Sequence, residues 1–322
     1  MDTFVANVIR DIHLSQRVML SFNNHLEQVL GGALKEYTGA VFFVDILGVG
    51  ALTQGKINIS KEDFLAHNFN YNSEFSEHQF CAKLLLKFRR ILISATENIK
   101  SIKVAQLSDC AFIWSEDPNK VVNVARDIMW RSVLGGLLCR GGLANGQIVE
   151  PDKINTKLGM FICGSAVTEA VKLEGIGKGA RVFIKPELAS ELQSIPHLAF
   201  IPRKSLIDFS FAYEFLWYRY PDHIQSSSVK FKKQQALEGI IKLIAILQYS
   251  PKYSWNSSSS LGRLQLASTI DIISSEIEKL DGHLDLKYED VIDSLEKRSD
   301  KKYKNTLNKY QQRINQKKSS RS

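Results

Sequence analysis

Residues 40–50 read AVFFVDILGVG and combine a continuous apolar run with an abrupt, glycine-rich end. β-Branched and aromatic residues dominate positions 40–44, a pattern typical of a strand that is buried on both faces. Asp45 follows this run directly, and Gly48 and Gly50 then permit a tight turn. The stretch therefore predicts a central strand that carries a carboxylate to one edge of a sheet.

Helical and extended patterns alternate along the chain from residue 52 to residue 184. Residues 52–78 are polar and asparagine-rich, and indicate an irregular insertion with a short helix. The segments after it are a helix over 80–99, hairpin strands over 102–107 and 111–114, a helix over 121–138, a strand over 140–149, a helix over 164–173 and a strand over 180–184. The order β-α-β-β-α-β-α-β predicts an α+β fold, a sandwich of helices packed against one sheet.

The chain divides into four segments by composition and periodicity. We expect an N-terminal helical segment (1–35), a main domain (36–225), a C-terminal helical extension (226–296) and a basic tail (297–322). In the extension, a helix is expected over 264–280.

Composition places the chain among globular proteins that bury a core, with 44% hydrophobic and 24% charged residues. The four cysteines are scattered without CxxC spacing, which favours reduced thiols in a cytosolic protein and argues against a zinc site. The N-terminus does not read as a signal peptide, and the most apolar run, 239–247, is too short to span a bilayer. We therefore expect a cytoplasmic protein with no membrane partner.

The net charge of +8 is concentrated at one end of the chain. Residues 297–322 hold ten basic residues and one acidic residue, so the remaining chain has a net charge of −1. The basicity thus belongs to the tail, and the core is not expected to bind nucleic acid.

Two aspartates are candidates for chemistry. Asp45 ends the central strand, and Asp109 lies at the expected hairpin turn. Aspartate is common at strand ends and turns, so either residue alone has an ordinary explanation. If the two strands are neighbours, however, the pair could hold two divalent cations while substrate phosphates supply the remaining ligands.

Four segments together resemble a known family. The segments 44–48 (VDILG), 107–110 (LSDC), 140–146 (RGGLANG) and 164–174 (GSAVTEAVKLE) are similar, in this order, to the signature segments of class III adenylyl and guanylyl cyclases. The resemblance covers about residues 38–190. It implies an enzyme that converts a nucleoside triphosphate into a 3′,5′-cyclic monophosphate and pyrophosphate with two Mn²⁺ or Mg²⁺ ions per active site.

The resemblance also implies roles for individual residues. Asp45 and Asp109 match the metal-binding aspartates, and Ile46 matches a residue whose backbone carbonyl joins the second metal. The resemblance implies that the Arg140 side chain binds the triphosphate together with three backbone amides, those of Leu47, Gly48 and Val49.

Thr168 and Lys172 stand where the family usually has the asparagine and arginine that stabilise the transition state. A hydroxyl replaces an amide and a point charge replaces a planar guanidinium, so this helix either uses Lys172 as its cation or is only structural. In the family, this helix and the metal-binding aspartates of one site come from different chains. A head-to-tail homodimer is therefore implied.

The positions that select adenine in the family depart from its pattern. Ala105 and Phe161 stand where adenylyl cyclases have a lysine and an aspartate, and neither side chain can pair with a purine edge. The sequence looks like the bacterial pyrimidine cyclases of the Pycsar antiphage system. The implied product is cyclic UMP, or alternatively cyclic CMP, read by a separate effector.

Other interpretations remain open at this point. The chain could be an adenylate or guanylate cyclase that recognises its purine differently, or a catalytically silent homologue that binds nucleotide or a partner protein. A GGDEF-type or polymerase-like palm domain shares two-metal chemistry, but the segments at 140 and 164 fit the cyclases better.

Overall fold

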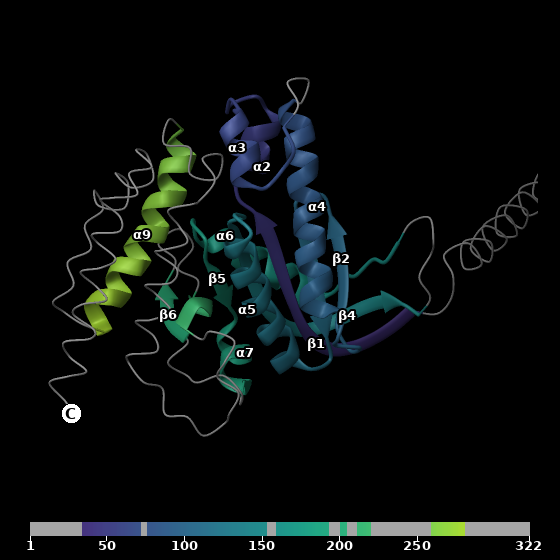
Figure 1. Ribbon diagram of the computed structural model, residues 1–322. Coiled ribbons are helices and arrows are strands. Elements are labelled where there is room, and N and C mark those ends of the chain that lie inside the picture. Colours follow the sequence, from purple (N-terminus) through teal and green to yellow (C-terminus); the bar gives the residue numbers. More distant parts are fainter. Residues whose placement is uncertain are drawn as a thin grey trace, which may run out of the picture.

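The computed structural model describes residues 34–71, 76–152, 159–192, 200–204, 211–219 and 259–280, and a single mixed sheet lies at the centre of this part (Figure 1). Its strands are β1 (Leu34–Ile46), β2 (Lys103–Leu107), β3 (Cys110–Ser115), β4 (Cys139–Pro151), β5 (Val182–Ile184), β6 (Phe200–Lys204) and β7 (Phe211–Phe215). The helices are α2 (Val49–Thr53), α3 (Lys61–Ala66), α4 (Glu77–Thr96), α5 (Pro118–Leu134), α6 (Ser165–Ile176), α7 (Pro186–Glu191) and α9 (Ser260–Leu280), and a 3₁₀ turn spans Trp217–Arg219. The expectations for 1–33, for 220–258 and for the basic tail lie outside the described residues.

The strand order across the sheet is β2-β3-β1-β4-β5-β7-β6. β1 lies between β3 and β4 and pairs with both of them in antiparallel fashion. β2 and β3 form the predicted hairpin, and β4 runs parallel to β5, with α6 as the connection. The α+β class and the element order predicted up to residue 184 are confirmed.

The alternating side chains of β1 face two different layers. Ala40, Phe42 and Val44 are fully buried in the main hydrophobic core, which also contains apolar residues of α4 and α5. Val41 faces the opposite side, where a smaller cluster includes Ala166 and Ala170 of α6. Helices therefore cover both faces of the sheet, and Asp45, an odd-numbered residue like Val41, belongs to the α6 face.

Local signals explain the helix boundaries. α5 begins at Pro118 because the Asp117 side chain accepts hydrogen bonds from the Asn119 and Lys120 amides. It ends at Leu134, four residues earlier than predicted, because Gly135 and Gly136 follow and Gly136 adopts a φ of +76°.

The helix predicted over 264–280 is α9, and it packs into the main core. Leu266, Ile270 and Ile273 of α9 are buried in the same cluster as the central strand. Two polar side chains fasten it to the loop before β5: Gln265 accepts from the Gly179 amide and Thr269 accepts from the Ala180 amide. In the described ranges, no helix is long and apolar enough to cross a membrane.

Candidate active site at the end of the central strand

Asp45 at the end of β1 and Asp109 in the turn before β3 lie at the same edge of the sheet. Asp45 is opposite Cys110 in the β1–β3 register, and the Ile46 amide donates to the Asp109 carbonyl over 3.0 Å. Asp109 sits in the two-residue turn between β2 and β3, where Ser108 takes the positive φ of +57°. The hairpin thus brings the second aspartate beside the end of the central strand, which is the arrangement that a shared metal site requires. Both residues are half-buried.

Arg140 faces Asp45 from the other side of β1. The two residues are opposite each other in the β1–β4 register, and Arg140 Nη2 lies 3.3 Å from Asp45 Oδ2. Arg140 Nε also forms an ion pair with Oε1 of Glu174 on α6. The site therefore contains Glu174, which was part of the quoted motif but was not predicted as a site residue.

The site has an excess of negative charge that alters its acid–base properties. Burial raises the pKa of Asp45 to about 6, the Arg140 guanidinium opposes this shift, and Asp109 and Glu174 add to it. Burial likewise raises the pKa of Glu174, against the opposing charges of Arg140 and Lys178. One guanidinium pairs with two of these three carboxylates, Asp45 and Glu174, so a divalent cation would relieve the remaining repulsion.

The close approach of α6 depends on a glycine of β4. A Cβ added at Gly142 would lie 2.0 Å from the Ala170 carbonyl oxygen and 2.7 Å from the Glu174 amide nitrogen. Only a residue without a side chain lets the helix backbone rest on the strand at this point. Gly142 follows Arg140 by two positions on the same strand face, so this contact places Glu174 within reach of the guanidinium.

The turn after β1 leads into the five-residue helix α2. Gly48 adopts the left-handed conformation with a φ of +92°, which explains the glycine at this position. The Leu47 amide donates to the Leu138 carbonyl over 2.7 Å, so a phosphate could use that amide only by replacing this bond. The predicted phosphate contacts of Gly48 and Val49, and the metal contact of the Ile46 carbonyl, stay predictions.

Thr168 and Lys172 do not join the aspartates within one chain. Ala170 and Glu174 face the sheet, and at about 100° per residue the side chains two positions before and two after Ala170 point to the opposite side of α6. Both are exposed. Thr168 donates to the Gly164 carbonyl over 3.3 Å, and Lys172 pairs with Glu169 at 2.8 Å.

The two residues predicted to affect base choice lie in different settings. Ala105 shares the α6 face with Phe43 and Phe112, whose ring centroids are 4.8 Å apart, and it packs against the smaller cluster. Phe161 lies on the segment before α6 and is 48% exposed. The two are not in contact among the described interactions.

The chemistry of the donors fits a site for hard divalent cations. Among the described residues, no group of three or more histidine, cysteine, aspartate or glutamate side chains is arranged to hold a metal ion. Two carboxylates supply only part of the coordination shell of Mg²⁺ or Mn²⁺. These ions take their remaining oxygen ligands from water and from substrate phosphates. Asp45 and Asp109 provide such a pair.

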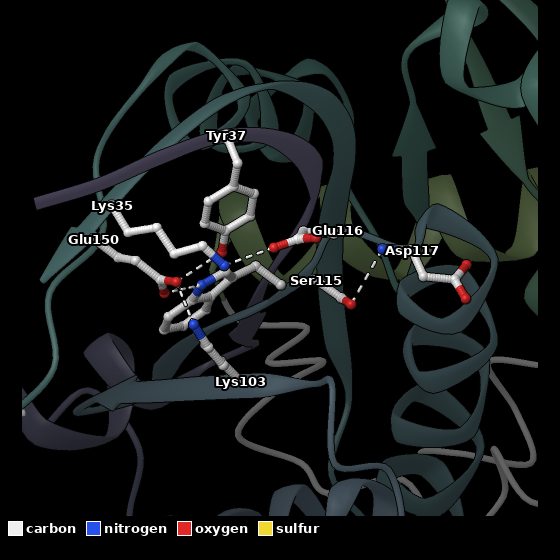
Figure 2. Close-up of polar contacts among 8 residues, drawn as sticks. Lys35, Tyr37, Lys103, Ser115, Glu116, Asp117 and Glu150 are labelled. Carbon is white, nitrogen blue, oxygen red and sulfur yellow. Dashed lines mark hydrogen bonds and ion pairs between the residues drawn. The ribbon is translucent and has the colours of Figure 1, made fainter. Parts of the chain in front are cut away.

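A second polar cluster lies on the same face at the opposite end of β1, and Figure 2 shows the side chains that meet at Glu150. This buried carboxylate accepts from Tyr37 Oη at 3.0 Å and from Trp114 Nε1 at 2.8 Å, and it also pairs with Lys103. Burial alone would raise the pKa of Glu150, but these hydrogen bonds outweigh it and lower the pKa. Each partner is engaged within the fold, so we interpret the cluster as structural.

Sequence comparisons assign no family: no family model matches the chain, and no curated protein of similar sequence was found. Solved structures with local similarity include the catalytic core of a rhodopsin-guanylyl cyclase with converted specificity in complex with ATPαS. It is 16% identical, covers 57% of this chain and 98% of its own, and has a TM-score of 0.38. The adenylyl cyclase CyaB from P. aeruginosa is 15% identical over 57% of this chain and 95% of its own, with a TM-score of 0.40. A bacterial light-regulated adenylyl cyclase is 16% identical over 76% of this chain and 67% of its own, with a TM-score of 0.41. At these identities and TM-scores, the similarity assigns no function to this chain.

Proposed function

We propose that the protein is a class III nucleotide cyclase that closes a nucleoside triphosphate into its 3′,5′-cyclic monophosphate and releases pyrophosphate. The observation that supports this most is the meeting of Asp45, Asp109 and Arg140 at one edge of the sheet, in the order of the signature segments. Two carboxylates and one cation are the groups that a triphosphate and its metal ions require.

Each residue of the site has a separate part in this proposal. Asp45 and Asp109 would hold Mn²⁺ or Mg²⁺, which on binding activates the 3′-hydroxyl and neutralises charge on the phosphates. Arg140 lies beside Asp45, and its guanidinium would bind phosphate oxygens through paired N–H groups. The half-burial of Asp45 strengthens these interactions because water screens them less.

The direction in which Thr168 and Lys172 point supports a homodimer. Both lie on the exposed face of α6, turned away from the aspartates of their own chain. A second copy in a head-to-tail arrangement would bring the α6 of each chain to the aspartates of the other. In that arrangement Lys172 would exchange Glu169 for the charge developing on the triphosphate.

For the base, we propose a pyrimidine, with UTP preferred over CTP. Ala105 and the aromatic pair Phe43 and Phe112 offer an apolar surface one row away from Asp45, without a charged group to read a purine edge. A site that leaves the polar edge of a purine unpaired penalises it. Phe161 would approach the base from the segment before α6. A role in antiphage signalling, with the product read by a separate effector, rests on the resemblance alone.

The test of activity is to incubate the purified protein with each of the four ribonucleoside triphosphates and Mn²⁺ and to separate the products. We expect turnover of UTP above CTP, with ATP and GTP at least about tenfold lower, or roughly 1.4 kcal/mol of transition-state discrimination. Asp45→Asn and Asp109→Asn should abolish turnover. Asp127→Asn, which removes only a surface ion pair with Arg131 on α5, should not. ATP cyclised as fast as UTP would overturn the pyrimidine claim alone.

The dimer has its own test by complementation. Asp45→Asn chains and Lys172→Ala chains should each be inactive, but mixed dimers hold one intact site. Random mixing in equal amounts should restore about a quarter of the wild-type activity. Activity that stays absent after mixing, with both variants dimeric, would contradict shared sites.

A second candidate is a silent homologue that binds nucleotide without turnover. It is favoured by the local hydrogen bond of Thr168 and the ion pair of Lys172, which engage both side chains within α6. Tight UTP binding without product in the same assay would support it.

A further inference from the structure

The guanidinium of Arg140 is shared between two carboxylates that come from different elements. Its Nη2 lies 3.3 Å from Asp45 Oδ2 on β1, and its Nε pairs with Glu174 on α6. The Glu174 side chain is 10% exposed, so this contact is largely shielded from water. A partly buried ion pair of this kind constrains the direction of the guanidinium plane.

The backbone that carries Glu174 is held at two points. At Gly142, β4 touches the α6 backbone itself, at the Glu174 amide nitrogen. Beyond the end of α6, the amides of Gly179 and Ala180 are bound by Gln265 and Thr269 of α9. Glu174 therefore approaches Arg140 from a fixed position.

We propose that Glu174 is a positioning residue that holds Arg140 by its Nε edge and so keeps the guanidinium from closing on Asp45. A guanidinium that is free to turn binds a carboxylate through two parallel N–H···O bonds, which occupy both carboxylate oxygens. Asp45 is already within reach of Nη2, and removing Glu174 leaves it as the nearest anion. With Glu174 in place, Arg140 contacts Asp45 through one nitrogen only, and the second oxygen stays open to a divalent cation. The inference rests on the proposed function in one respect, namely that this cation is the metal held by Asp45 and Asp109.

The main variant is Glu174→Gln, which keeps the shape of the side chain and removes its charge. Glu187→Gln on the exposed surface of α7 is the matched control. If the released guanidinium covers Asp45 for most of the time, the competent fraction falls to about one fifth, and the apparent dissociation constant for Mn²⁺ rises about fivefold.

A general field effect must be separated from action through Arg140. Loss of any nearby negative charge weakens cation binding, and it does so whether or not Arg140 is present. The Glu174→Gln change is therefore repeated in an Arg140→Met background. There the fivefold loss should disappear if Glu174 acts by holding the guanidinium, and should persist if only its charge matters.

Two measurements test the proposal. The first is the Nε–Hε NMR signal of Arg140 in metal-free protein, which is assigned by its absence in Arg140→Met. This proton should be protected from solvent exchange in wild type and in Glu187→Gln. In Glu174→Gln the protection should be lost. Mn²⁺ alone is then titrated into each folded variant and the free ion is followed by electron paramagnetic resonance, with Asp45→Asn as the blank. A protected signal in Glu174→Gln, an unchanged Mn²⁺ affinity, or an equal loss in the Arg140→Met background would each overturn the positioning role. If wild type binds Mn²⁺ no better than Asp45→Asn does, the metal site of the proposed function is contradicted. The exchange measurement then still tests whether Glu174 holds Arg140.

Discussion

Asp45 and Arg140 face each other across β1 and β4, with Arg140 Nη2 3.3 Å from Asp45 Oδ2. The ion pair only partly offsets the cost of placing Asp45 in a half-buried position near Asp109, because the pKa of Asp45 is still raised to about 6. A functional carboxylate that lowers the stability of its own fold is common in active sites.

Replacing Asp45 with asparagine should therefore stabilise the metal-free protein at neutral pH, by about 3 kcal/mol. Between pH 4 and pH 6 the native state binds more protons at Asp45 than the unfolded state does, so this residue lowers wild-type stability as the pH rises. The advantage of Asp45→Asn should be full above pH 6 and vanish below pH 4. Denaturant unfolding with a chelator present, across this range, measures it. Equal stability of the two proteins at pH 7 would be inconsistent with a raised pKa.

Gly142→Ala should destabilise the fold and disturb the site together. The added methyl group would meet the Ala170 carbonyl oxygen at 2.0 Å, so α6 must move away from β4. We expect a loss of about 1–3 kcal/mol in the free energy of unfolding. Gly175→Ala, on the same helix with no atom within 4 Å of the added methyl, should be neutral or stabilising by about 0.5–1 kcal/mol. A thermal melt of both variants makes the comparison, and similar melting temperatures would refute the close approach of α6.

Glu150→Gln should destabilise the fold at neutral pH without involving the active site. Lys103 loses its buried counter-charge, and one of the donors from Tyr37 and Trp114 loses a charged acceptor, at a cost of about 1–3 kcal/mol. Because the pKa of Glu150 is lowered, its stabilisation is present above the pKa of the unfolded state and is lost as the pH falls.

The matched control for Glu150→Gln is Glu116→Gln, which removes the exposed ion pair with Lys35 in the same region (Figure 2). Its effect should stay within about 0.5 kcal/mol. If the two substitutions cost the same in urea unfolding, the buried network does not stabilise this end of the sheet.

Thr269→Val should weaken the attachment of α9. Valine keeps the volume but removes the acceptor for the Ala180 amide, and a buried unpaired amide costs about 1–3 kcal/mol. Thr96→Val near the end of α4 removes only local bonds to the Leu92 and Ile93 carbonyls and should change stability by less than about 0.5 kcal/mol. Hydrogen exchange of the Ala180 amide provides the readout, and unchanged protection in Thr269→Val would contradict the contact.

Much of the site could be predicted because it depends on local patterns along the chain. The apolar run that ends at Asp45 and the hairpin turn at Asp109 each have a sequence signal, and antiparallel pairing of their strands brings them together. The contact of Glu174 with Arg140 has no such signal, because it depends on how closely α6 crosses β4 at Gly142. The outward direction of Lys172 likewise became visible only once the buried side of α6 was known.

The part of the fold that could not be predicted lies beyond residue 184. β6 and β7 extend the sheet, but β6 reads Phe-Ile-Pro-Arg-Lys, in which a proline and two charges obscure the alternation expected of a strand. β6 is the last strand in the sheet order, and proline is tolerated there because an edge strand has free hydrogen-bonding groups on one side. Position in the sheet, and not intrinsic propensity, therefore explains this strand.

The fastening of α9 to the loop before β5 also has a consequence for the order in which the protein is completed on the ribosome. Gly179 and Ala180 bind side chains that follow them by 86 and 89 residues. At about 5–20 residues per second, these partners emerge roughly 4–18 seconds after the amides that they bind. During that interval the central strand and its hairpin are already available to pair, while the loop that ends α6 waits for α9. A late event of synthesis therefore fixes the end of the element that carries Glu174, and a nascent chain completes this contact only after Thr269 has emerged.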